Sequence, residues 1–142
     1  MADSIVNLML KEHKIINELL SYFEDIIEED FSDSKNVFSK LNWDIEKHFF
    51  IEERAIFKLY PKNNLDKDIK RLLDEHKKIT NLLDLISEEI SNGKKPSTHN
   101  LKTLLSNHSR FENDTFYPRL ENELNEEEKI LIIERVKEII EG

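Results

Sequence analysis

The 142-residue sequence contains no cysteine, two glycines and three prolines. Without cysteine, neither a disulfide framework nor a thiolate-bound zinc or iron–sulfur site can form. The scarcity of glycine and proline leaves little material for the tight turns of a sheet protein. We therefore expect an all-α fold, and the length suits one domain over residues 1–142.

Long apolar runs and basic clusters are also missing. No apolar stretch approaches the roughly 20 residues that a membrane helix needs, and the N-terminus lacks the features of a signal peptide. These absences predict a cytoplasmic protein with no membrane partner. The formal net charge of −9 would repel nucleic acid, so we expect no nucleic-acid partner either. Excess carboxylate is typical of cation-binding proteins, and equally of ordinary helical proteins.

Apolar residues recur every three or four positions in four long segments and one short one. The first expected helix covers about residues 4–29. After a polar break at 30–35, a second runs to about Tyr60, before Pro61. The third opens over residues 63–66 and ends at about 91–93, with Gly93 as the terminator of that helix. The fourth starts over 96–99 and runs to about 123, and the fifth covers about 126–141.

Four long helices with short connections predict an up-and-down four-helix bundle over about residues 4–123. The short C-terminal helix, about 126–141, either covers the bundle or meets a second subunit in a homodimer.

The first half of the bundle sequence is repeated in the second half. Residues 10–20 align with 73–83, which pairs His13 with His76 at an offset of 63 positions (76 − 13). The apolar positions of the two segments align as well. The bundle is therefore expected to consist of two equivalent helical hairpins.

The repeat continues in the second helix of each hairpin. An offset of 60 positions (108 − 48) pairs His48 with His108 and Glu52 with Glu112. In each His-x-x-x-Glu step the two side chains lie about 40° apart on one helix face. These positions face the expected core, so the polar side chains are predicted to be buried.

Two interpretations of these buried residues are open. A single histidine on an apolar face is usually a core residue with a hydrogen-bond partner, and mutual His–Glu salt bridges would then hold the set. Alternatively, metal ions offset the cost of burying carboxylates. Four histidines and two glutamates are too many for one tetrahedral zinc ion. Shared between two ions, with the carboxylates bridging, they leave positions open for a small molecule.

The ordered set His, His-x-x-x-Glu, His, His-x-x-x-Glu, with Glu-His-Lys around His13 and His76, resembles the hemerythrin-like family of HHE cation-binding domains. The resemblance covers about residues 5–120. It implies a hemerythrin-like bundle with a non-haem di-iron centre, bridged by carboxylate and by oxo or hydroxo groups. The implied iron ligands are His13, His48, Glu52, His76, His108 and Glu112.

The chain departs from oxygen-carrying hemerythrins at two points. Leu72 and Thr80 stand four residues before and after His76, where those proteins have a further histidine, and Glu112 stands where they have aspartate. The resemblance therefore favours a protein that binds, senses or reduces O2, NO or peroxide, with a redox partner protein if it is an oxidoreductase.

Other functions stay open. Within the same family resemblance, iron storage, iron donation and iron repair are alternatives, and zinc or manganese are less favoured occupants. A metal-free helical interaction module is the alternative from another class.

Several neighbouring residues carry weaker expectations. Glu53 is expected to be a surface carboxylate or to lie just outside the ligands, and Glu12 and Glu75 to face solvent rather than orient imidazoles. His99 lies about 180° round the helix from His108 and should face solvent.

Aromatic side chains are expected around the polar residues. Phe49, Phe50 and Phe111 are predicted to form apolar walls that limit the access of water. Tyr117 is predicted to pack at the edge of the core or at a helix end.

Overall fold

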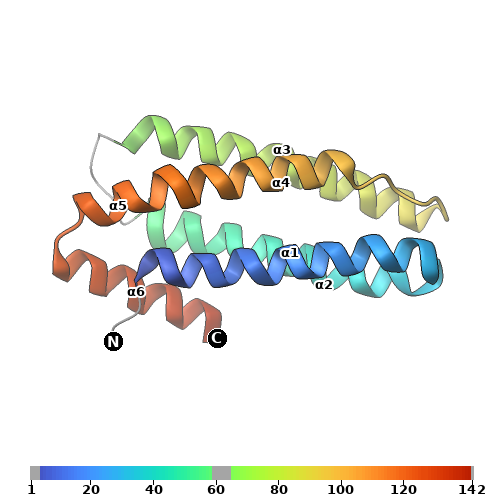
Figure 1. Cartoon of the computed structure of the whole chain (residues 1–142), viewed down its shortest axis with the longest axis horizontal. Helices are drawn as coiled ribbons and strands as arrows, with labels where there is room; N and C mark the ends of the chain where they lie inside the picture. The colour runs from blue at the N-terminus through green and yellow to red at the C-terminus, as the bar shows by residue number, and fades with distance from the viewer. Residues whose placement is uncertain (1–3, 59–64, 142) are drawn as a thin grey trace.

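The computed structural model describes residues 4–58 and 65–141, and this part of the chain contains helices and no strand. Figure 1 shows the long helices packed lengthwise, with the C-terminal helix lying at an angle beside the start of the N-terminal helix. The predicted four-helix bundle of two helical hairpins is confirmed. The four long helices are α1 (Ile5–Glu29), α2 (Phe31–Ile51), α3 (Asp66–Ser91) and α4 (His99–Phe111).

The second helix of each hairpin changes from α-helix to π-helix near the middle of the bundle. The α2 helix continues as η1 (Glu52–Phe57), and α4 continues as η3 (Glu112–Phe116) and then α5 (Tyr117–Glu123). The two π-helical stretches begin at repeat-equivalent glutamates. A π-helical turn takes in more residues than an α-helical turn, so the side chains that follow point in directions that α-helical periodicity does not predict.

The predicted helix ends are confirmed at some positions and wrong at another. Gly93 follows α3 with a φ of 75°, the left-handed conformation expected of a terminating glycine. The predicted polar break over residues 30–35 is wrong, because α2 begins at Phe31. The hydroxyl of Ser34 donates to the carbonyl of Phe31 at 2.6 Å, so these polar residues form the first helical turn. The predicted end at Tyr60 and Pro61 lies outside the described residues.

The C-terminal helix α6 (Glu126–Glu141) covers one end of the bundle. Its first turn is capped reciprocally, since Asn125 Oδ1 accepts from the Glu128 N–H at 2.8 Å and Glu128 Oε1 accepts from the Asn125 N–H at 3.1 Å. Ile132 and Val136 are buried in the same apolar cluster as the start of α1 and the η1 stretch. Across residues 4–58 and 65–141, no helix is long and apolar enough to cross a bilayer.

Two apolar clusters fill the bundle, one on each side of a polar layer. The cluster next to α6 draws on the start of α1, η1, the start of α3 and α5. The other cluster fills the far half, from the remaining parts of α1, α2, α3 and α4. In α1, for example, Met9 belongs to the first cluster and Ile16 to the second, with buried His13 between them. The polar layer is therefore closed off at both ends by packed apolar side chains.

Candidate metal centre

The structure brings all six predicted ligand residues together in the polar layer. Each side chain is at most 5% exposed. Their donor atoms form two groups in which all atoms lie within 4.8 Å of one another. Glu112 belongs to both groups, as a carboxylate that bridges two ions would. The first group is His13, His48 and Glu112, and the second is Glu52, His76, His108 and Glu112.

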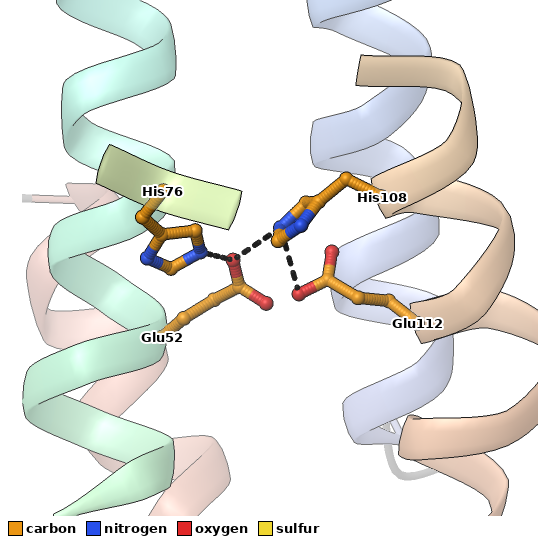
Figure 2. Close-up of side chains that lie close together, drawn as sticks. All are labelled: Glu52, His76, His108 and Glu112. Atoms are coloured by element: carbon orange, nitrogen blue, oxygen red, sulfur yellow. Dashed lines mark hydrogen bonds and ion pairs between the residues drawn. The ribbon is translucent and has the colours of Figure 1, made fainter. Parts of the chain in front are cut away.

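The second group is drawn in Figure 2. Nε2 of His76, from α3, lies 3.1 Å from Oε1 of Glu52. Nε2 of His108, from α4, lies 3.7 Å from the same oxygen and 3.4 Å from Oε2 of Glu112. The two imidazoles and the two carboxylates therefore converge from four different segments of the bundle, α3, α4, η1 and η3.

The first group is equally compact. Nε2 of His13 lies 3.0 Å from Nε2 of His48 and 3.0 Å from Oε1 of Glu112. Two nitrogens that bind one ion at about 2.1 Å, in adjacent coordination positions, are roughly 3.0 Å apart. The spacing of the two imidazoles thus suits a shared ion.

Hydrogen bonds at the outer nitrogens of three imidazoles determine which ring nitrogen carries the hydrogen. Nδ1 of His76 donates to Oε2 of Glu53 at 2.8 Å, and Nδ1 of His108 donates to Oε1 of Glu75 at 2.7 Å. Nδ1 of His13 donates to Oδ1 of Asn113 at 2.9 Å. In the neutral ring, the inward Nε2 then carries a lone pair, which is the form that binds a metal ion.

Two inward atoms of the layer and one outer nitrogen have no hydrogen-bond partner among the residues that the structure describes. In the described ranges, the buried atoms without a hydrogen-bond partner are His48 Nδ1, His108 Nε2 and Glu112 Oε2. Leaving such atoms unpaired costs about 1–3 kcal/mol each. His108 Nε2 and Glu112 Oε2 face each other across the layer, and a cation between them would satisfy both. The residues present therefore fit a metal ion.

Burial and neighbouring carboxylates together set the charge of His13, His48 and His108. Burial lowers the pKa of His13 to about 3, with His48 adding to the effect, and it lowers the pKa of His48 as well. Burial also acts on His108, but its contacts with Glu52 and Glu75 outweigh burial and raise its pKa to about 9. Burial alone would raise the pKa of Glu52, but its histidine neighbours, His48 foremost, hold that pKa well below its usual range. The metal-free layer thus combines two neutral imidazoles, those of His13 and His48, with a protonated His108 and the ionised carboxylate of Glu52.

The predictions for the surrounding carboxylates have mixed outcomes. Glu53 lies just outside the ligand candidates, on His76, which is one of its two predicted roles. The prediction that Glu75 faces solvent is wrong, since it accepts from His108 with 19% of its side chain exposed. Asn113 was not predicted to contribute to the site at all. Its position in the repeat was the available signal, because an offset of 60 (113 − 53) pairs it with Glu53.

Tyr117 also belongs to the site, and its predicted role in packing at the core edge or at a helix end is wrong. The side chain is fully buried, its hydroxyl donates to Oε2 of Glu52, and its ring stacks on His13 with centroids 6.2 Å apart. Burial raises the pKa of Tyr117 well above its usual value, so the hydroxyl keeps its proton. The η3 stretch turns this residue inward. The repeat pairs it with Phe57, which stacks on His76 at 6.0 Å.

The predicted apolar walls are confirmed only in part. Phe49 is buried and stacks on His76 with ring centroids 3.8 Å apart. Phe50 is 51% exposed, so its predicted role is wrong: the adjacent helical position points outward. Phe111 is half-buried, with the Arg71 guanidinium 3.8 Å above its ring.

A solvent-exposed groove lies beside the polar layer. This groove of about 670 Å³ between α2–η1 and α3 reaches His76 and is also lined by Phe49, Phe50, Glu53 and Arg54.

The prediction for His99 is confirmed. This histidine lies at the start of α4, is exposed and is away from the polar layer.

Comparison with known proteins agrees with the geometry. A family model described as the hemerythrin HHE cation binding domain matches residues 4–120, which include all six residues of the polar layer. No curated protein and no solved structure matches the chain significantly. The match covers most of the sequence, together with a helical bundle that encloses a His/Glu cluster able to hold metal. The chain belongs to the hemerythrin HHE cation-binding domain family.

Proposed function

We propose that this protein binds two iron ions in the polar layer and uses them to bind, sense or reduce a small molecule such as O2, NO or peroxide. The observation that carries this proposal is the pair of buried donor groups that share Glu112. One ion would be held by His13 and His48, and the other by His76 and His108. Glu52 and Glu112 would lie between the ions.

The donor set supports iron because imidazoles and carboxylates together suit this metal, although they also accept zinc or manganese. Bound iron would supply open coordination positions and a change of oxidation state. The protein itself supplies the orientation: Glu53, Glu75 and Asn113 each hold one imidazole through its outer nitrogen.

Residues of this chain also control protons and water around the centre. The hydroxyl of Tyr117 retains its proton and holds Oε2 of Glu52 in place. The apolar clusters above and below the layer exclude bulk water. The groove that reaches His76 offers a small molecule a route from solvent to the layer.

The proposal is tested by measuring metal content on protein purified without oxygen, followed by absorption spectra as O2, NO and peroxide are added in turn. We expect about two irons per chain and near-ultraviolet bands of a bridged iron pair. The spectrum should respond differently to each added molecule. A chain that contains no transition metal and takes up none on reconstitution would contradict the proposal and favour a metal-free interaction module.

A further inference from the structure

The two hairpins hold their first-helix histidines in the same way but with chemically different groups. His76 donates to Glu53 at 2.8 Å, and His13 donates to Asn113 at 2.9 Å. Glu53 and Asn113 are equivalent in the repeat, each being the residue after a glutamate of the polar layer. The geometry is thus shared, while the acceptor is a carboxylate in one case and a neutral amide in the other.

The second-helix histidines differ as well. His108 donates to Glu75 at 2.7 Å. The repeat pairs Glu75 with Glu12 at an offset of 63 (75 − 12). Nevertheless, Nδ1 of His48 has no hydrogen-bond partner in the part of the chain that the structure describes. One half of the polar layer therefore has two carboxylates hydrogen-bonded to its imidazoles. The other half has one hydrogen-bonded amide, and Glu12 acts on His48 only through its charge.

This difference affects how strongly each half can hold a cation. A carboxylate that accepts the outer N–H of a ligand imidazole makes the inner nitrogen more basic, and loss of such a partner typically lowers metal affinity 10- to 100-fold. A neutral amide forms a weaker hydrogen bond than an ionised group does. Glu75 should act more strongly than Glu53, because 19% of its side chain is exposed against 44% and water screens exposed charge.

We infer that the two halves of the centre bind their ions with unequal affinity, and that the half with His76 and His108 binds more tightly. In this inference, which rests on the proposed function, Glu53, Glu75 and Asn113 are positioning residues that set the difference. The ion held by His13 and His48 is then the exchangeable one. The centre would keep one ion while the other is gained or lost.

The test is a titration of the metal-free protein with Co²⁺ in the absence of oxygen. Binding is monitored by calorimetry and by absorption spectroscopy. We expect two binding steps whose dissociation constants differ at least about tenfold. His13→Ala should remove the weaker step, and His76→Ala should remove the tighter one. These two variants assign each step to its half of the layer.

Exchanging the acceptors tests their role directly. Glu53→Gln should weaken the tighter step about tenfold, and Asn113→Asp should strengthen the weaker step by a similar factor. A gain of affinity in Asn113→Asp cannot arise from a damaged fold. Glu88→Gln is the matched control, because it removes an exposed carboxylate on α3 outside the polar layer, and both steps should then stay unchanged.

The outcomes separate this inference from the proposed function. Two steps of equal affinity in the natural protein would overturn the inference and leave the metal centre standing. An unchanged ratio of the two steps in both exchange variants would overturn the inference in the same way. If the natural protein binds neither Co²⁺ nor Fe²⁺, the proposed function itself is overturned.

Discussion

The α1–α2 hairpin and the α3–α4 hairpin contribute the same three polar residues and surround them differently. Each provides one histidine from its first helix and a His-x-x-x-Glu step from its second. Around these residues, Tyr117 replaces Phe57 and Asn113 replaces Glu53. The duplicated part therefore places the donor atoms. The residues that differ between the hairpins determine which hydrogen bonds support the donor atoms. They therefore limit how similar the two halves of the polar layer are in structure.

The comparison also shows that neither hairpin forms its half of the layer alone. His13 lies 3.0 Å from Glu112 of the other hairpin, and His76 lies 3.1 Å from Glu52 of the other hairpin. Each first-helix histidine also receives an outer partner and a stacked ring from the opposite hairpin. Assembly of the polar layer therefore requires the two hairpins to pack together.

The largest expected effect on metal binding comes from substituting Glu112, the residue that both donor groups share. Glu112→Ala should leave less than one ion per chain, whereas His76→Ala should leave about one. Metal bound only to the folded state stabilises it by about 4 kcal/mol at a thousandfold excess over Kd, so the rise of Tm with metal should vanish in Glu112→Ala. Metal content and Tm check both points. His99→Ala, at an exposed site, is the control, and an unchanged metal response in Glu112→Ala would contradict the assignment.

A matched pair of substitutions in the apolar core tests whether the two hairpins contribute equally to stability. Leu20 and Leu83 correspond in the repeat and are both buried in the cluster far from α6. Leu20→Ala and Leu83→Ala should each lower the free energy of unfolding by about 2–5 kcal/mol and leave the metal stoichiometry unchanged. Denaturant unfolding measures the loss. A difference between the two variants of more than about 2 kcal/mol would show that the apolar half of the repeat has diverged too.

Exchanging the stacked aromatic rings sharpens the comparison. Tyr117→Phe removes the hydroxyl that donates to Glu52, so it should destabilise the metal-free protein by about 1–3 kcal/mol. Phe57→Tyr places a hydroxyl at the repeat-equivalent position, which the repeat directs toward Glu112, whose Oε2 has no hydrogen-bond partner in the described structure. It should be neutral or stabilising by about 1 kcal/mol. Thermal unfolding of both metal-free variants checks the signs, and equal losses in the two would argue against equivalent environments.

The smallest effect is expected outside both hairpins. Asn125→Ala removes the side chain that caps α6 and should cost about 1 kcal/mol. The affinity for metal should not change, because the cap lies away from the polar layer. Unfolding and a Co²⁺ titration of the same variant test this. A loss of metal affinity would mean that α6 supports the layer as well as the end of the bundle.

Helical periodicity and the repeat together predicted the bundle and the six residues that converge in its centre. Both signals depend on regular α-helix, in which a side chain's direction follows from its position. They therefore placed the six polar residues, and the error at Tyr117 lies beyond Glu52 and Glu112 in the chain. Tyr117 follows a π-helical stretch, which the periodicity of an α-helix cannot represent.

The remaining errors have a different origin. The contacts of Glu75 and Asn113 form between helices, so they depend on how the hairpins pack rather than on the pattern within one helix. The predicted start of α2 is too late because serine and aspartate are favoured both in loops and in first helical turns. The assignment of the six residues as ligands stays a prediction.

The measurement that tests the central claim most directly is anomalous diffraction at the iron edge from crystals of the iron-loaded protein. Two peaks are predicted within the polar layer, one beside His13 and His48 and the other beside His76 and His108, with Glu112 in contact with both. The peak beside His13 and His48 should lose occupancy first when a chelator is added. The absence of any peak in the layer, or a peak only at the protein surface, would contradict the claim.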